Sequence, residues 1–269
     1  DVPSARGPQL EDGARDIPPP EAADERAHEV RAASMAKTAA AKSKLNNKYS
    51  RSIYVAAKSG VPDPELNLAL KHEIEKAKRE QVNADTIKRA IEKAKGGSME
   101  SYVPVRYEGF GPNNSMLIIE CLTDNENRTL TAVKTALSRC GCKLGVAGCV
   151  RHMFNYYAVF SFEGLSDEEA LEAVMAADCD VVDIFNEDGV TTVYADSSNY
   201  QEVKQALLNA KADLVFLEDT TTYVPQTTVE LTDEKEVAQF NRLRDMLDEI
   251  DDVQDLFHNI VNLPDEEEE

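Results

Sequence analysis

The sequence has no tryptophan, few aromatic residues and no long apolar run. Phe and Tyr together make up 6% of the 269 residues, so a folded core must consist mainly of Ile, Leu, Val and Ala. No apolar stretch approaches the roughly 18 residues that a membrane-spanning helix needs, so we predict no membrane association. Glycine and proline contribute only 12 and 11 residues, which excludes collagen-like and low-complexity chains.

Cysteine and histidine are too few and too scattered to predict a metal centre or a catalytic site. The five cysteines are an odd number in a long chain, which predicts free thiols in a reducing compartment. Cys140, Cys142 and Cys149 lack the paired spacing of a zinc site. No Ser-His-Asp or nucleophile-elbow motif is present. We therefore predict no metal, no cofactor and no enzymatic activity.

Basic residues are outnumbered, and they are unevenly distributed. The chain has 50 acidic residues against 29 Lys and Arg, a net charge of −21. Residues 36–97 hold 14 bases and 7 acids, whereas residues 98–269 hold 35 acids and 11 bases. Nucleic acid is repelled by the chain as a whole but not by residues 36–97, which are therefore the candidate binding region. The acidic remainder favours a basic protein partner.

The two ends of the chain are expected to lie outside the folded domains. Residues 1–33 are rich in Asp, Glu, Pro and Ala and offer few apolar side chains to offset the entropy of ordering. We predict a flexible acidic arm there and an acidic, mobile tail over residues 263–269.

A predicted helix from about Met35 to Lys58 carries a basic stripe. The stripe consists of Lys37, Lys44, Lys48, Arg51 and Lys58, and Lys42 adds to its charge. At about 100° per residue the stripe occupies an arc of roughly 80°, away from the apolar side that contains Leu45 and Ile53. We predict that these residues bind nucleic acid; the alternative is an ordinary solvated helix face.

Two shorter helices complete a basic helical domain over residues 34–98. One contains Leu66, Leu70 and Ile74, and the other begins after Asn83 and ends at Gly96. The outer side of the third helix presents Lys88, Arg89 and Lys93, which we predict to be a second nucleic-acid-binding surface.

The acidic part of the chain alternates between strands and helices. The expected strands cover residues 116–122, 143–144, 150–154, 157–162, 181–185, 191–195, 214–217 and 253–258. The expected helices cover residues 129–139, 167–177, 199–210 and 233–248. Residues 157–224 then read β-α-β-β-α-β, which is the ferredoxin-like order, and residues 99–156 plus 225–262 read the same way. The predicted fold class is α+β, with an N-terminal three-helix domain followed by two ferredoxin-like α+β domains, one inserted in the other.

Two short motifs in the acidic part are candidate functional loops. The run from Tyr107 through Glu108, Gly109 and Gly111 to Pro112 is predicted to be a tight loop entering a strand. Its backbone N–H groups are candidates for phosphate binding, although it lacks the Lys-Ser/Thr ending of a P-loop.

The second motif joins a strand to a helix. Its candidate residues are Asp124, Asn125, Asn127, Arg128 and Thr129. Asn, Asp and Thr cap helices, and an Arg at the positive end of a helix favours an anion or a partner carboxylate. The alternative is that the motif only caps the helix.

Several runs resemble the YebC/PmpR family over about four-fifths of the chain. They are residues 53–58 (IYVAAK), 63–67 (DPELN), 87–94 (IKRAIEKA), 107–112 (YEGFGP), 122–129 (LTDNENRT) and 251–254 (DDVQ). The runs at 107–112 and 122–129 together are specific to the family. The resemblance implies a helical N-terminal domain, two α+β domains and no enzymatic activity.

The resemblance also implies a role in gene expression. Some members are described as DNA-binding transcriptional regulators, whereas others act on the ribosome, and mitochondrial members activate translation of cytochrome c oxidase subunit I. We expect a monomeric factor that binds the large ribosomal subunit, through ribosomal RNA and ribosomal proteins, in translation activation or subunit assembly. The alternatives are a transcriptional regulator bound to duplex DNA, which the net charge opposes, and a protein–protein adaptor.

The beginning of the chain departs from the family pattern. Members usually open with a basic Gly-His-Ser-Lys-Trp run, whereas residues 22–35 here include Asp24, Glu25 and Glu29 and no Trp. This places in question the contact that the run makes. Because the sequence begins with Asp1 and extends ahead of the family's usual start, we expect a mitochondrial matrix protein, with the bacterial cytoplasm as the alternative.

Overall fold

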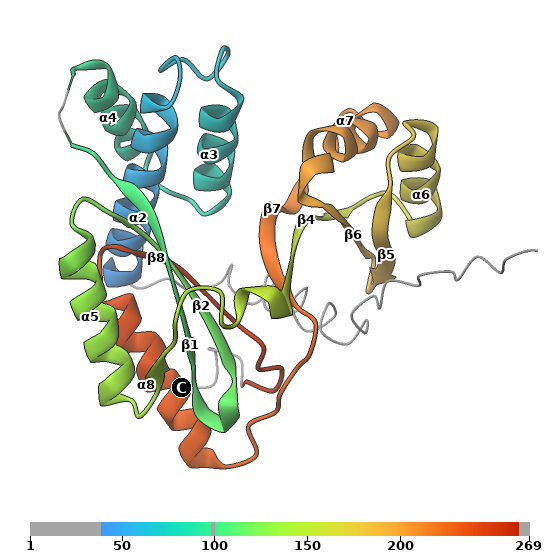
Figure 1. Cartoon of the computed structure of the whole chain (residues 1–269). Helices are drawn as coiled ribbons and strands as arrows, with labels where there is room; N and C mark the ends of the chain where they lie inside the picture. The colour runs from blue at the N-terminus through green and yellow to red at the C-terminus, as the bar shows by residue number, and fades with distance from the viewer. Residues whose placement is uncertain (1–38, 98–99, 264–269) are drawn as a thin grey trace, which may run out of the picture.

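The chain folds into a helical region and two antiparallel sheets, each of which carries two helices on one face. A computed structural model describes residues 39–97 and 100–263 (Figure 1). The helical region, residues 39–97, lies beside both sheets in Figure 1. The fold is α+β, as the sequence predicted. Lys37, the acidic arm and residues 264–269 of the acidic tail lie outside the described residues.

Three helices form the helical region. They are α2 (Ala39–Lys58), α3 (Leu68–Arg79) and α4 (Ala84–Lys95). The side chains of Asn67 and Asn83 cap α3 and α4 by accepting a hydrogen bond from a backbone N–H in the first turn. Ile53, Leu70 and Ile87, one from each helix, meet in a shared apolar core. The helical region therefore has a core of its own.

The first sheet contains strands from both ends of the acidic part of the chain. Its order is β3 (Lys143–Leu144), β1 (Val103–Phe110), β2 (Met116–Thr123) and β8 (Val253–His258), all antiparallel. Helices α5 (Glu126–Arg139) and α8 (Glu234–Asp248) cover one face (Figure 1).

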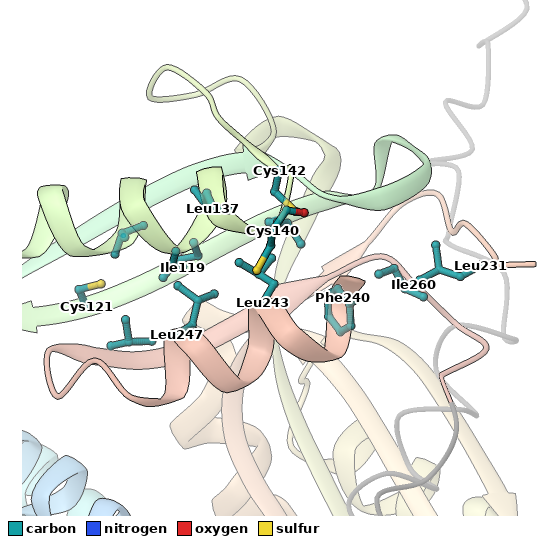
Figure 2. Packing of buried hydrophobic residues seen from close by; sticks show 14 residues of the cluster. Ile119, Cys121, Leu137, Cys140, Cys142, Leu231, Phe240, Leu243, Leu247 and Ile260 are labelled. Atoms are coloured by element: carbon teal, nitrogen blue, oxygen red, sulfur yellow. The ribbon is translucent and has the colours of Figure 1, made fainter. Parts of the chain in front are cut away.

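The first core lies between this face and the two helices. Figure 2 shows Ile119 of β2 beside Leu137 of α5 and Leu243 of α8. Cys140 and Cys142 are buried in the same cluster, and their thiols are free. Burial raises the pKa of the Cys142 thiol to about 11, so this side chain is protonated at neutral pH and serves as an apolar filler.

The second sheet is built entirely from residues that lie between β3 and α8 in the chain. Its order is β5 (Val181–Glu187), β6 (Val190–Asp196), β4 (Phe154–Glu163) and β7 (Phe216–Pro225), all antiparallel. Helices α6 (Asp167–Ala176) and α7 (Tyr200–Ala210) pack on one face through a core that includes Phe160 and Leu207. The chain order and strand order are those of the ferredoxin-like unit that the sequence predicted.

The first sheet differs from its predicted connectivity in one strand. Residues 150–154 were expected to be a strand, but Arg151–Met153 form a 3-10 turn and Phe154 begins β4. The strand that completes the first sheet is instead β1, which pairs with β2 along its whole length. The prediction of a loop at residues 107–110 is therefore wrong. Arg106 and Glu120 face each other across the β1–β2 pair, which explains why no simple apolar run marked β1.

Candidate nucleic-acid interface

Three of the predicted basic residues of α2 pair with carboxylates at the end of α8, in the following turn and in β8. Lys44 pairs with Asp248, the Nζ atom of Lys48 lies 2.6 Å from Asp255, and Nη1 of Arg51 lies 2.6 Å from Asp252. We call these three pairs the α2 contact. Burial opposes the charge of Lys48, but the neighbouring Asp255 carboxylate raises the pKa of Lys48 above its ordinary value. Three of the five residues of the basic stripe are thus paired with carboxylates within the chain.

Asp252 is the centre of the α2 contact. The whole residue is 4% exposed, and its carboxylate accepts hydrogen bonds from Arg51, from Arg128 at 2.9 Å and from the Thr129 hydroxyl at 2.7 Å. Burial opposes ionisation, but the hydrogen bonds from Arg128, Arg51 and Thr129 hold the pKa of Asp252 below its ordinary value. The carboxylate therefore stays charged and ties α2 to the start of α5.

The second predicted motif forms this junction. Asn125 caps α5 by accepting a hydrogen bond from the Arg128 N–H, and Asp124 pairs with the Arg128 guanidinium at 2.7 Å. Asn127 is exposed on the first turn of α5. Capping and a partner carboxylate were both among the predicted roles, and the partner carboxylate is Asp252 of the same chain.

The first predicted motif supports the fold around β1. The Glu108 side chain is 4% exposed and accepts hydrogen bonds from the backbone N–H groups of Gly148, Val150 and Arg151 at 2.8 to 2.9 Å. Burial opposes ionisation, but these three donors hold the pKa of Glu108 below its ordinary value. Tyr107, Glu108 and Gly109 lie within β1, so no phosphate-binding loop forms there.

Gly109 and Gly111 are required by close packing. A Cβ atom on Gly109 would lie 2.5 Å from the Lys143 carbonyl oxygen of β3. A Cβ atom on Gly111 would lie 2.6 Å from the Ser115 hydroxyl. Both glycines allow neighbouring segments to approach the β1–β2 pair more closely than an L side chain permits.

A second contact joins α3 to the second sheet. Nη1 of Arg79 lies 3.1 Å from Asp219, a residue of β7 that is 1% exposed. Lys204 and the Tyr200 hydroxyl also bind Asp219, and the Tyr200 hydroxyl lies 2.8 Å from Nδ1 of His72. We call this cluster the α3 contact. Sequence reasoning did not identify it, because its members are spread over about 150 residues and match no spacing rule.

Four of the eight exposed cations among residues 39–97 lie on α4, and the other four are Lys42 and Lys58 of α2 and Lys71 and Lys78 of α3. Lys88 and Arg89 are exposed and carry no ion pair among the described residues. Lys93 is exposed but pairs with Glu100 at 2.6 Å. Lys58 of α2 is also exposed. Its Nζ atom lies 5.7 Å from the centre of the Tyr54 ring, and the Nζ atom of Lys93 lies 5.8 Å from the same ring centre. Helix α4 packs on α2 and α3, and Figure 1 shows it at the outer edge of the helical region.

A cleft of about 720 Å³ opens where α2, α3, the first sheet and β7 meet. Residues from all four walls reach it, including Lys76, Arg106, Glu120 and Thr222. The cleft carries charges of both signs and lies between the α2 contact and the α3 contact. Within residues 39–97 and 100–263 there is no cluster of three metal-binding side chains and no helix able to span a membrane.

Comparison with known proteins identifies the family. Residues 26–97 match the TACO1/YebC protein N-terminal domain, and residues 102–260 match the TACO1/YebC second and third domain. The chain belongs to the TACO1/YebC family. The resemblance inferred from the short motifs is thereby confirmed.

Bacterial members of the TACO1/YebC family are close in sequence along most of the chain. A probable transcriptional regulatory protein of Pseudoalteromonas translucida is 50% identical over 236 residues, which is 88% of this chain and 98% of the relative. One from Acholeplasma laidlawii is 50% identical over 237 residues, with the same coverage. These relatives agree with the bacterial alternative for the origin of the chain and give the mitochondrial expectation no support.

A solved member of the family has the same architecture. The crystal structure of a conserved hypothetical protein from Aquifex aeolicus matches with a TM-score of 0.70 at 31% identity. The match covers 87% of this chain and 95% of the Aquifex protein.

Proposed function

We propose that this chain is a non-enzymatic regulator of gene expression that binds nucleic acid through its helical region. The exposed basic face of α4, which we define as Lys88, Arg89 and Lys95, is the observation that carries the proposal. These cations stand on a helix at the outer edge of the helical region, the part of the chain in which bases outnumber acids, so phosphates meet less repulsion there than at the acidic sheets. Lys58 lies at the adjoining end of α2 and extends the same face.

Duplex DNA is the first candidate ligand. The relatives from Pseudoalteromonas and Acholeplasma are named probable transcriptional regulatory proteins. A straight helix with cations on its outer side suits the width of the major groove. Regulation of transcription is therefore the function we place first.

Binding to the large ribosomal subunit is the second candidate, and it is favoured by charge. Residues 98–269 carry 35 acids and 11 bases, which suits a basic protein partner better than a long DNA duplex. The α4 face is small, so it fits a local RNA contact supported by contacts with ribosomal proteins. The bacterial cytoplasm is compatible with both candidates.

The test compares the full-length chain with a Lys88→Ala/Arg89→Ala variant. Binding to a 30-base-pair duplex, to single-stranded RNA and to purified large ribosomal subunits is measured at several salt concentrations. Removing two phosphate contacts is expected to weaken binding at every salt concentration and to reduce the slope of log affinity against log salt by about 2. A Lys134→Ala/Arg139→Ala variant is the matched control, because it removes an exposed Lys and Arg from α5.

The ligand with the highest affinity decides between the two candidates. Preference for duplex DNA supports transcription, and preference for the ribosomal subunit supports translation or subunit assembly. Equal weakening by the α4 variant and the α5 control would reject the α4 face. Absence of binding to all three ligands would reject the proposed function.

A further inference from the structure

The α2 contact pairs three cations of one helix face with three carboxylates. Lys44 meets Asp248 of α8, Lys48 meets Asp255 of β8, and Arg51 meets Asp252 in the turn between these elements. Carboxylates beside a basic helix present the same kind of acceptor oxygen that phosphates would present.

The three pairs differ in their access to solvent. The side chains of Lys44 and Asp248 are 31% and 60% exposed, and those of Lys48 and Asp255 are 24% and 45% exposed. Arg51 and Asp252 are 19% and 5% exposed. Solvent and salt therefore reach the carboxylates of Asp248 and Asp255 but not that of Asp252, and this access weakens the two lysine pairs even though Lys48 is itself nearly as covered as Arg51.

The two lysine pairs can open without disturbing the buried junction. Asp252 keeps Arg128 and Thr129 as partners whatever Lys44 and Lys48 bind. Tyr49 and Ile53 hold α2 in the helical core from its other side. Exchange of the partners of Lys44 and Lys48 thus requires only side-chain movement at the exposed end of the α2 contact.

We propose that the α2 basic face is a second phosphate-binding surface of the chain and that Asp248 and Asp255 compete with nucleic acid for it. This inference rests on the proposed function and adds a way in which nucleic-acid binding is regulated. Nucleic acid first meets the cations of α4, and its phosphates then displace Asp248 and Asp255 from Lys44 and Lys48. The aspartates thereby keep the affinity of the chain for short or sparsely charged polyanions low.

The test uses the full-length Asp248→Asn/Asp255→Asn variant with a 30-base-pair DNA duplex and a single-stranded RNA of equal charge as probes. Release of the two lysines is expected to raise affinity about three- to thirtyfold, the range set by two exposed ion pairs. It is also expected to steepen the slope of log affinity against log salt by about 2. Adding Lys44→Ala and Lys48→Ala to this variant is expected to cancel both changes.

Asp245→Asn/Asp251→Asn is the matched control. It removes two exposed aspartates from the same part of the chain that carry no ion pair among the described residues. Net charge changes equally in the two variants, so a general electrostatic effect would raise both affinities alike. Thermal unfolding of each variant verifies that the fold is retained.

The outcomes separate this inference from the proposed function. Equal affinities of the two aspartate variants, with binding by the unmodified chain that depends on Lys88 and Arg89, would overturn the inference alone. Binding by the Asp248→Asn/Asp255→Asn variant but not by the unmodified chain would support it and move the main site from α4 to α2. Absence of binding by every variant would overturn both.

Discussion

At the residue scale, two buried carboxylates determine how the helical region is held. Asp252 and Asp219 are 4% and 1% exposed, and each binds an arginine from the helical region together with a cation from a helix that packs on a sheet, Arg128 of α5 or Lys204 of α7. Leaving a buried carboxylate without its cation costs several kcal/mol of folding free energy, on the order of 3 to 5 kcal/mol. Loss of either arginine therefore destabilises the aspartate that it binds. Single residues thus link regions that are distant in the sequence.

His72 makes this arrangement sensitive to pH. Burial, followed by the positive charge of Lys76, lowers the pKa of His72 to about 4. The unfolded chain binds a proton at His72 near pH 6.5, whereas the folded chain does so only near pH 4, so stability falls as the pH drops between these values. We predict that the free energy of unfolding decreases by about 1 to 2 kcal/mol from pH 7 to pH 5 because of this residue.

Urea unfolding of the unmodified chain and of His72→Gln at pH 7 and pH 5 checks this prediction. Glutamine can still bind the Tyr200 hydroxyl but does not titrate, so the variant should lose less stability between the two pH values. Asp219 and Asp252 do not contribute to this change. Burial opposes their ionisation, but neighbouring cations and hydroxyls hold their pKa values below the ordinary value, and both pH values lie above that range. Identical pH dependence in the two proteins would show that His72 does not cause it.

At the element scale, the β1 strand shows which parts of the fold the sequence could predict. The helices and most of the second sheet followed from apolar periodicity and capping residues such as Asn83. The strand expected at residues 214–217 shares only residues 216 and 217 with β7. β1 was missed because its exposed first half carries Pro104 and Arg106, and its last half contains a glycine that reads as a turn. Gly109 is needed for packing against β3, a reason that no local pattern contains.

Gly109→Ala tests the packing of β1 against β3. The added Cβ would lie 2.5 Å from the Lys143 carbonyl oxygen, a backbone atom that can move only with its strand. We predict a loss of about 1 to 3 kcal/mol in the free energy of unfolding, measured by urea denaturation. Gly96→Ala is the control, because its Cβ would meet nothing closer than 3.4 Å and should change stability little. A loss equal to that of the control would mean that β3 adapts without cost.

At the scale of the whole molecule, the helical region is placed by polar contacts with two different sheets. Arg51 connects it to the first sheet and Arg79 to the second. The sequence predicted that residues 34–98 would form a basic helical domain but not where its charges would point. The partners of Lys44, Lys48 and Arg51 lie about 200 residues further along the chain. Composition and periodicity carry no information about such distant pairs.

The Arg51→Ala/Arg79→Ala variant should release the helical region from both sheets while each core stays folded. We predict an increase of a few ångströms in the radius of gyration, measured by small-angle X-ray scattering, with little change in helix content by circular dichroism. Lys42→Ala/Lys71→Ala removes two exposed lysines from the same helices and should leave the radius unchanged. An unchanged radius in the arginine variant would show that the remaining contacts, including Lys48–Asp255 and His72–Tyr200, hold the regions together without the two arginines.

The position of the second sheet between β3 and α8 has a consequence for synthesis of the chain. Helix α2 leaves the ribosome early, but Asp248 is added 204 residues after Lys44. At a rate of about 5 to 20 residues per second, about 10 to 40 seconds pass between synthesis of the α2 cations and synthesis of their carboxylate partners. The intervening α+β unit is complete by Pro225, before α8 and β8 exist, so it folds ahead of the sheet that surrounds it in the sequence. The nascent chain therefore closes its first sheet only after β8 is made, and α2 docks on its carboxylate partners no earlier.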